Sequence, residues 1–335
     1  MITGDSLITA CAIGKEVGII NSDSEGILGE ELDKYSDEEL KDVVVNYNLY
    51  ARVSPKHKTR IVKAWQALGK VVAMTGDGVN DAPAIKEAHV GVGMGITGTE
   101  VTKSVADVIL LDDSFSTIID AVEEGRRIFS NIRNNVVYSL SSNFAELFTV
   151  LIGMFTGHTI LLPIHILFID LVTDTIPSIC LSFEKAERGV MDKNPRGINK
   201  PIFTPFVKAC VAYSAIVETI IALLTYFISL KLFDSNIAAS LALLSIVVQE
   251  LLYAVSCRNL KDFVYKQGLF SNKQMNIGLL VVIGIELLVF LTPLGSFLNI
   301  ASLDIKTLVV VVLLNFIGLF LYEIGKPVLK KIFKD

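Results

Sequence analysis

Residues 74–83 have the sequence Met74-Thr75-Gly76-Asp77-Gly78-Val79-Asn80-Asp81-Ala82-Pro83, and this segment indicates the fold class of the first part of the chain. It begins at the end of an apolar run, which predicts a buried strand that leads into a polar loop. Strand candidates at 71–74, 90–94 and 108–111 alternate with helical patterns at 58–68 and 81–88. This alternation is typical of a parallel α/β sheet, whose ligands bind at the carboxyl ends of the strands.

Three short segments of this region carry groups suited to phosphate and magnesium. Thr3-Gly4-Asp5 and Thr75-Gly76-Asp77 each place a hydroxyl beside a glycine, whose backbone N–H can approach a phosphate oxygen closely. Lys58 offers a positive charge to the same anion. The side-chain oxygens of Asp77, Asn80 and Asp81 are the hard ligands that Mg²⁺ prefers. Taken alone, this last group could equally form a turn with an Asx cap.

The second part of the chain differs in composition. The sequence of 335 residues is 52% hydrophobic, compared with about 45–50% for a soluble domain. The excess lies after residue 133, where apolar runs long enough to cross a bilayer recur. We therefore expect a soluble unit followed by a membrane unit, with the lipid bilayer as a partner. The formal net charge of −5 gives no indication of a nucleic-acid partner.

Six apolar segments are predicted to span the membrane, at 134–156, 160–183, 205–231, 237–257, 275–292 and 306–325. Basic residues gather in alternate connections and in the tail, namely Lys185, Arg188, Lys193, Arg196 and Lys200, then Arg258, Lys261, Lys266 and Lys273, then Lys326, Lys330, Lys331 and Lys334. The other loops, at 157–159, 232–236 and 293–305, contain no Lys or Arg. The positive-inside rule then places both termini of a multi-pass protein in the cytoplasm, and we expect the membrane to be the plasma membrane.

Oxygen-bearing side chains recur inside these segments, where ionisable groups are costly and usually functional. Those with helical spacing are Asn143 and Glu146 in the first span, Asp170, Thr173 and Asp174 in the second, and Glu250 in the fourth. None of these three spans contains a Lys or Arg that could pair with the carboxylates. We therefore expect an oxygen cage for a hard cation, with Pro177 allowing the second span to unwind. For Glu218 and Glu286, a polar contact at a helix interface is the favoured interpretation.

Together, Met1-Ile2-Thr3-Gly4-Asp5, Ala51-Arg52-Val53-Ser54-Pro55 and residues 74–83 resemble the phosphorylation domain of P-type ATPases. The resemblance continues through Gly93-Met94-Gly95 and Ala106-Asp107 and covers the membrane part as well. It implies a partial α/β domain with the haloacid-dehalogenase-like fold, followed by an all-α membrane domain of six helices. The expected boundaries are 1–116 for the phosphorylation domain, 117–133 for an amphipathic stalk helix and 134–335 for the cation-transport domain.

The resemblance also implies roles for individual residues. Within Thr3-Gly4-Asp5, the Thr-Gly pair would hold the transferred phosphoryl group, whose source is ATP. Lys58 would contact the phosphate and stabilise the charge that develops on it. Asp77 would be the chief protein ligand of the catalytic Mg²⁺, and Asn80 and Asp81 would complete the network around phosphate and metal.

The aspartate that such pumps phosphorylate is not found in this sequence. In the family it lies in an Asp-Lys-Thr-Gly-Thr motif, whereas here Asp33-Lys34 is followed by Tyr35 and Asp192-Lys193 by Asn194. The resemblance assigns that motif to an N-terminal part of the same pump, together with the nucleotide-binding domain, the actuator domain and four membrane helices. We therefore expect the chain alone not to form the phosphoenzyme.

The resemblance narrows the identity of the transported cation. Ser142-Asn143-Phe144-Ala145-Glu146 is similar to the fifth membrane helix of calcium and sodium pumps, and residues 170–174 are similar to the sixth. Asp170 matches the sodium/potassium pumps, whereas Glu250 fits the calcium pumps better. A soft metal would need thiolates, and Cys180 lies away from the carboxylates. Ca²⁺ is the favoured cation, and Na⁺, with or without K⁺, is the alternative.

Two interpretations from other classes stay open. One is a dehalogenase-like phosphatase fused to a membrane anchor, although carboxylates in several spans argue against a simple anchor. The other is a non-catalytic membrane remnant that associates with an intact pump.

Overall fold

The computed structural model describes residues 1–187, 189–197 and 200–333. Arg188 and Lys334, which belong to the predicted basic loop and tail, lie outside the described residues. The chain forms two compact units, one of Met1–Val122 with Asn194–Lys200 and the other of Glu123–Lys193 with Pro201–Asp335. Each unit is considered by itself.

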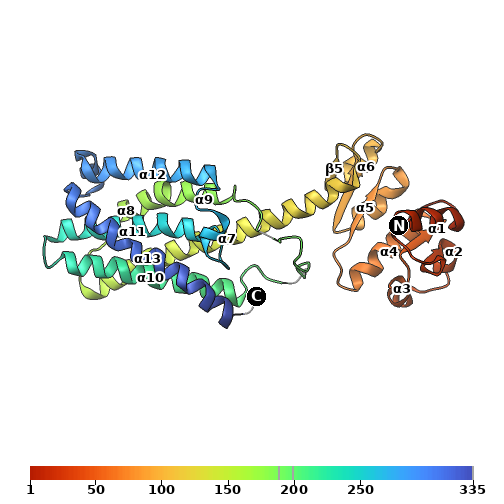
Figure 1. Ribbon diagram of the computed structural model, residues 1–335, viewed down its shortest axis with the longest axis horizontal. Helices are drawn as coiled ribbons and strands as arrows, with labels where there is room; N and C mark the ends of the chain where they lie inside the picture. The colour runs from red at the N-terminus through yellow and green to blue at the C-terminus, as the bar shows by residue number, and fades with distance from the viewer. Residues whose placement is uncertain (188, 198–199, 334–335) are drawn as a thin grey trace. The chain divides into compact units, whose positions relative to one another are not determined.

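The first unit contains two parallel sheets, which confirms the α/β prediction (Figure 1). In one, β1 (Gly26–Leu28) pairs with β2 (Leu49–Ala51), and Ile2 bridges to Tyr50 on β2. The other has the order β3-β4-β5, made by β3 (Ala73–Gly76), β4 (Val90–Met94) and β5 (Val108–Leu110). The helices are α1 (Leu7–Glu16), η1 (Asp23–Glu25), α2 (Gly29–Leu32), α3 (Asp37–Val44), α4 (Pro55–Ala67), η2 (Val79–Asp81), α5 (Ala82–Glu87) and α6 (Glu100–Val105).

Local sequence explains how this unit presents its polar loops. The hydroxyl of Ser54 accepts a hydrogen bond from the N–H of His57 at 3.4 Å, and Pro55 is the first residue of α4, so Lys58 lies in the first turn of this helix. Ile2 packs against a buried cluster that includes Met74 on β3. The Thr-Gly pairs that follow Ile2 and Met74 therefore leave the same apolar core.

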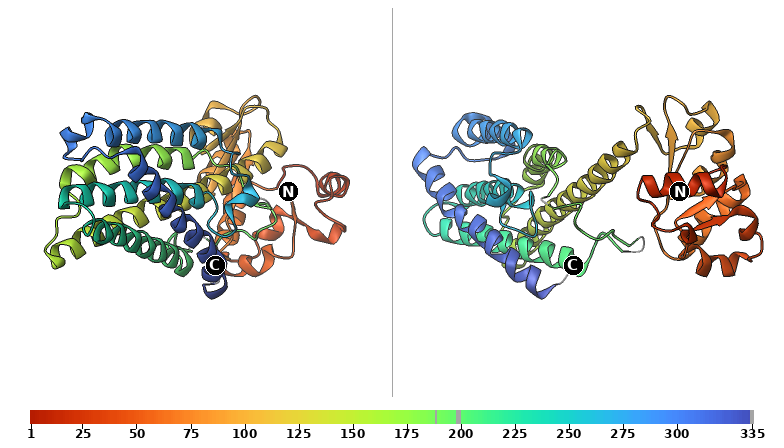
Figure 2. Two further views of the ribbon diagram at one scale, coloured as in Figure 1. Left: turned by 60° about the vertical axis from the view of Figure 1, so that its left-hand side comes forward. Right: turned by 45° about the vertical axis from the view of Figure 1, so that its right-hand side comes forward.

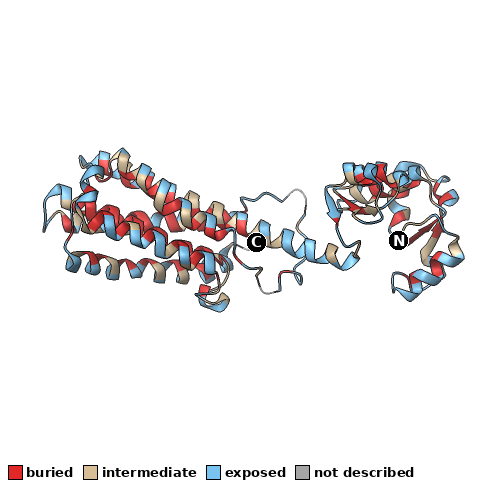
Figure 3. Ribbon diagram, turned by 90° about the horizontal axis from the view of Figure 1, so that it is seen from above, coloured by how far each residue is buried: buried red, intermediate tan, exposed pale blue. Residues whose placement is uncertain are grey.

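The second unit is a bundle of long helices. Its elements are α7 (Phe115–Thr156), which begins in the first unit, α8 (Pro163–Phe168), η3 (Ile169–Asp174), α9 (Thr175–Leu181), α10 (Pro205–Ser229), α11 (Ser235–Cys257), η4 (Val264–Gln267), α12 (Lys273–Leu291), η5 (Pro293–Leu298) and α13 (Ile305–Ile332). Six helical segments of the described residues are long and apolar enough to span a membrane, as the sequence predicts. The predicted stalk at 117–133 and the first span form one continuous helix, α7, whose N-terminal half is largely exposed (Figure 3).

Helix α11 is the most buried of the six spans, and it packs against α9, α10 and α13 (Figure 2). A close approach between α11 and α13 is possible because Gly318 has no side chain. A Cβ at Gly318 would lie 1.9 Å from Oε1 of Gln249, whose amide group donates 2.8 Å hydrogen bonds to the side-chain and main-chain oxygens of Asn315. Small residues have this role in many membrane helix pairs.

The second span widens where the sequence predicts unwinding. Residues Ile169–Asp174 form a π-helical segment, and the helix continues through Pro177 within α9. Proline lacks an N–H and cannot complete the regular α-helical bond to the turn before it, so the irregular turn lies on its N-terminal side. The hydroxyl of Thr175 donates to the carbonyl of Asp170 at 2.7 Å and supports this wider turn.

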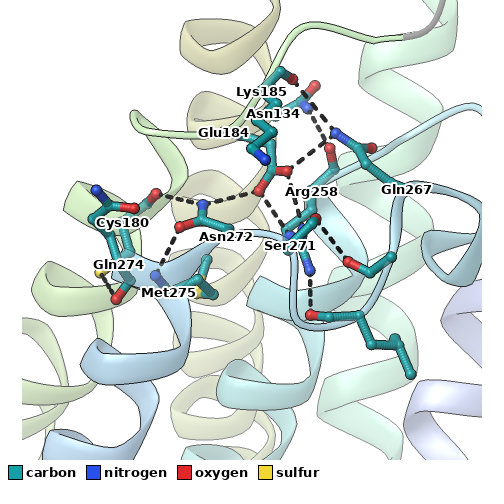
Figure 4. A network of polar contacts seen from close by, with 12 residues as sticks. Asn134, Cys180, Glu184, Lys185, Arg258, Gln267, Ser271, Asn272, Gln274 and Met275 are labelled. Carbon is teal, nitrogen blue, oxygen red and sulfur yellow. Dashed lines mark hydrogen bonds and ion pairs between the residues drawn. The ribbon is translucent and has the colours of Figure 1, made fainter.

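A buried ion pair holds the ends of several helices together (Figure 4). The guanidinium of Arg258, at the end of α11, donates to both carboxylate oxygens of Glu184 at 2.7 and 3.0 Å. Glu184 also accepts hydrogen bonds from the side chains of Gln267 at 3.1 Å and Asn272 at 2.9 Å. Its main-chain oxygen accepts from Asn131 of α7 at 2.9 Å. This network therefore ties α7, the end of α9, α11 and the start of α12 to one point.

Candidate phosphate and cation sites

The loop after β3 is organised by Asp81. Its carboxylate forms an ion pair with Lys58 of α4 and accepts the N–H of Gly78 at 3.3 Å. The aspartate is buried and its side chain lies against Gly76, where a Cβ would come within 2.4 Å of the Cβ of Asp81. Lys58 and Asp81, each predicted from the sequence as a site residue, are thus brought together. Only glycine fits at position 76.

Asp77 and Asn80 lie at the open side of this loop. Both residues are exposed. The main-chain oxygen of Asp77 accepts the N–H of Thr99 at 2.9 Å and the hydroxyl of Thr102 at 3.3 Å, which anchors the backbone of the loop. Among the described residues, no hydrogen bond or ion pair involves the carboxylate of Asp77. The exposed carboxylate of Asp77 therefore lies in the same loop as the buried carboxylate of Asp81. This donor set fits Mg²⁺, which takes one or two carboxylates and otherwise water or phosphate oxygens.

The segment Thr3–Asp5 forms a turn of its own. The N–H of Thr3 donates to the carbonyl of Tyr50 at 2.9 Å, and the Thr3 hydroxyl donates to Asp5 Oδ2 at 2.9 Å. Among the described residues, no hydrogen bond or ion pair joins this turn to Lys58 or to residues 77–81. The shared apolar core is what relates the two Thr-Gly turns.

A carboxylate that was not among the predicted site residues holds the next loop of the same sheet. Asp113 accepts the N–H groups of Gly95 at 2.7 Å, Ile96 at 3.0 Å and Thr97 at 2.8 Å, and also the Thr97 hydroxyl at 2.8 Å. Desolvation would raise the pKa of Asp113, but these hydrogen bonds outweigh it and lower the pKa to about 2. Asp113 is therefore a charged anchor for the loop after β4.

In the membrane unit, three of the predicted carboxylates are buried on different helices. Glu146 of α7 is 4% exposed, Asp174 at the end of η3 is 8% exposed, and Glu250 of α11 is fully buried. Asp174 accepts a hydrogen bond from the hydroxyl of Tyr138 at 2.9 Å. Oε1 of Glu146 and both carboxylate oxygens of Glu250 have no hydrogen-bond partner. Buried oxygens without partners are rare because they have lost water without replacing it.

The other predicted ligands are placed differently. Thr173 is buried and donates to Oε1 of Glu286 on α12 at 3.0 Å. Asp170 is half-buried and interacts electrostatically with Glu146 and Asp174. Asn143 lies on an exposed face of α7, where its amide donates to the carbonyl of Ser139 at 2.7 Å. No three His, Cys, Asp or Glu side chains of the described residues lie close enough together to hold a metal ion.

The described polypeptide also places two groups near these carboxylates that were not predicted as ligands. Tyr138 precedes the Ser-Asn-Phe-Ala-Glu motif by about one helical turn and looks like an ordinary membrane aromatic in the sequence. Glu218 of α10 is fully buried among the same acidic side chains. The sequence signal for Glu218 was only an isolated carboxylate in a span, which a helix-interface contact would explain equally well.

Comparisons with known proteins find matches for both parts of the chain. The family described as "Cation transporting ATPase, C-terminus" matches residues 158–328, and the haloacid dehalogenase-like hydrolase family matches residues 1–89. Calcium-transporting ATPase 1 of Bacillus cereus is 37% identical over 345 residues, covering 97% of this chain and 39% of the relative. A calcium-transporting ATPase of Listeria monocytogenes is 40% identical over 294 residues, covering 87% of this chain and 32% of the relative.

A eukaryotic relative shows the same extent of similarity. Calcium-transporting ATPase 1 of Schizosaccharomyces pombe is 37% identical over 338 residues, which cover 97% of this chain and 37% of the relative. The chain thus spans between 32% and 39% of the length of these curated relatives. The family match covers more than half of the chain, and the six membrane-capable helices make it a multi-pass membrane protein. The chain belongs to the family of cation-transporting ATPases.

Proposed function

We propose that this chain is the C-terminal part of a P-type ATPase that uses ATP to move Ca²⁺ across the plasma membrane. The observation that carries the proposal is the group of buried carboxylates with unpartnered oxygens on α7, η3 and α11. Hard cations bind carboxylate and carbonyl oxygens, and the buried cysteines lie elsewhere, which disfavours a soft metal. The relatives named above are calcium-transporting ATPases, which favours Ca²⁺ over Na⁺.

In this proposal the soluble unit handles the phosphoryl group. Thr3 and Gly4 hold its oxygens, Asp5 and Asp81 order the two turns, and Lys58 offsets negative charge. Asp77 is the protein ligand of Mg²⁺, and Asn80 contributes to the phosphate and metal network. When bound, Mg²⁺ supplies positive charge beside the transferred phosphoryl group. The phosphorylated aspartate, the nucleotide-binding and actuator domains and four more helices belong to the further length that the relatives have.

In the membrane unit, Glu146, Asp174 and Glu250 bind the cation, and Thr173, Asp170 and Asn143 complete the ligand set. The π-helical segment contributes because Pro177, which follows it, has no N–H and leaves a carbonyl of the preceding turn without its main-chain partner. Cation binding draws the separate carboxylates together and offsets their mutual repulsion. The long helix α7 carries Glu146 at one end and the stalk at the other, so it is the element that couples cation binding to the phosphoryl chemistry.

The test is steady-state ATP hydrolysis by the complete pump with Mg²⁺ present, while Ca²⁺ and Na⁺ are titrated separately. Wild type is compared with Glu146→Gln, which keeps the side-chain volume and removes the charge. We expect activation by micromolar Ca²⁺ that Glu146→Gln loses. Activation by Na⁺ alone would identify Na⁺ as the transported cation and make Asp170 the more important ligand. Activation by neither cation would contradict the cation site itself.

A further inference from the structure

Glu218 is an unusual side chain for the middle of an apolar helix. It lies on α10, it is fully buried, and neither of its carboxylate oxygens has a hydrogen-bond partner. Two other carboxylates of the same unit have partners: Glu184 binds Arg258, and Glu323 binds Lys326 and Ser256. Burying a carboxylate without a partner costs free energy. We therefore expect a specific group to bind next to the carboxylate of Glu218.

The surroundings of Glu218 are acidic. The hydroxyl of Thr219, the next residue along, donates to the carbonyl of Ala145 at 3.4 Å, so α10 meets α7 at the level of Glu146. Glu218 interacts electrostatically with Glu146 and Asp174, and Glu250 interacts with Glu218 in turn. Four helical elements, α7, η3, α10 and α11, thus contribute carboxylates that interact electrostatically with one another.

The described basic residues do not neutralise this group. Arg258 and Lys326 are the buried ones, and both are already paired, with Glu184 and Glu323. The hydroxyl of Tyr138 donates its hydrogen bond to Asp174. Among the described residues, no Lys or Arg is thus available to neutralise these carboxylates, and a bound cation fits as their counter-charge.

We propose that Glu218 is a ligand of the transported cation, contributed by a helix that supplies none of the sequence-predicted ligands. Its carboxylate adds a hard oxygen donor and a negative charge to those of Glu146, Asp174 and Glu250. The number of charges and of oxygen ligands sets the affinity of a site for a divalent cation. Glu218 therefore helps to set the affinity of this pump for the transported cation. This assignment rests on the proposed transport function.

The experiment measures equilibrium binding of radioactive Ca²⁺ to the complete pump in nanodiscs without nucleotide, with radioactive Na⁺ in parallel. Wild type is compared with Glu218→Gln and Glu146→Gln. Glu323→Gln is the matched control, because it is the same change in a membrane helix but at a carboxylate bound to Lys326. We expect Glu218→Gln to weaken cation affinity at least about tenfold, as Glu146→Gln does, and Glu323→Gln to change it less than about twofold.

The outcomes separate this assignment from the function on which it rests. If Glu146→Gln weakens binding while Glu218→Gln matches wild type, Glu218 is a helix-interface residue and the assignment is wrong. If wild type binds neither cation, the transport function and the assignment fail together. Should Glu218→Gln not fold, Glu218→Asp replaces it, because that variant keeps the charge and shifts it by one methylene. An unchanged affinity in Glu218→Asp would equally overturn the assignment.

Discussion

Asp113 makes the stability of the soluble unit depend on pH in a predictable direction. Its pKa of about 2 lies below the ordinary value of 3.8, so its stabilisation is fully present above pH 4 and is lost as the pH falls from about 4 to 2. Asp113→Asn tolerates the left-handed backbone at φ 52° but cannot supply the charge. We expect this variant to melt at a lower temperature at pH 7 and to lose less stability than wild type on acidification.

Trp65 is the single tryptophan of the sequence and packs against the core of the first unit, so its fluorescence reports the unfolding of that unit. Asp42→Asn, an exposed carboxylate on α3, is the control and should melt as wild type does. Equal pH slopes for wild type and Asp113→Asn would show that the loop hydrogen bonds do not depend on the charge.

Residues with a local signature could be predicted, and residues defined by tertiary contacts could not. The loop at 75–81 has a dense local pattern, and the structure brings its Asp81 to Lys58. Asp113 looks like one of two adjacent turn aspartates until β4 and β5 are paired. Glu218 carries no neighbouring motif, and its acidic surroundings come from other helices. Ligand roles in the membrane stay predictions, because burial is observed and cation binding is not.

Among the elements, the spans followed from hydropathy, and Pro177 indicated where the second span departs from a regular α-helix but not the form of that departure. Apolar length predicts six helices, because a bilayer requires about 20 apolar residues per crossing. The π-helical segment before Pro177 depends on how the second span packs, which no periodicity encodes. The network around Arg258 was likewise missed, since the residue looks like a basic loop residue and is 1% exposed in the fold.

The pair of Arg258 and Glu184 joins four helical elements, so its loss should destabilise the membrane unit as a whole. Arg258→Met leaves the carboxylate of Glu184 buried without its countercharge, which we expect to cost about 3–5 kcal/mol. Arg258→Met combined with Glu184→Leu removes both charges and should be less destabilising than Arg258→Met alone. A thiol-reactive dye can measure melting in detergent, because all four cysteines are buried in the folded protein.

The control for this experiment is an exposed ion pair of the same unit. Lys330 contacts Asp262 at 3.0 Å, and both side chains are about half exposed. Lys330→Met should therefore change stability by about 0–1 kcal/mol. If Arg258→Met were no more harmful than Lys330→Met, the buried network would not be what holds these helix ends together.

For the whole molecule, the sequence predicts the division into a charged and an apolar half, and the boundary between the two compact units lies near residue 122. The expected domain boundary at 116 is close to this point, but the stalk belongs structurally to α7. One helix passes from the first unit into the second, so a boundary inside it depends on contacts and not on a break in secondary structure.

Six spans and alternating basic loops predict one orientation for the whole chain. An even number of spans puts both ends on the same side, and the loops with Lys and Arg place that side in the cytoplasm. Single cysteines test this on intact cells with a membrane-impermeant maleimide, against a low background because the native cysteines are buried. Ser296→Cys, in an exposed position between α12 and α13, should be labelled directly, whereas Lys86→Cys and Lys266→Cys should be labelled only after permeabilisation. Labelling of Lys266→Cys but not Ser296→Cys on intact cells would invert the topology, and the loop charges would then not determine the orientation.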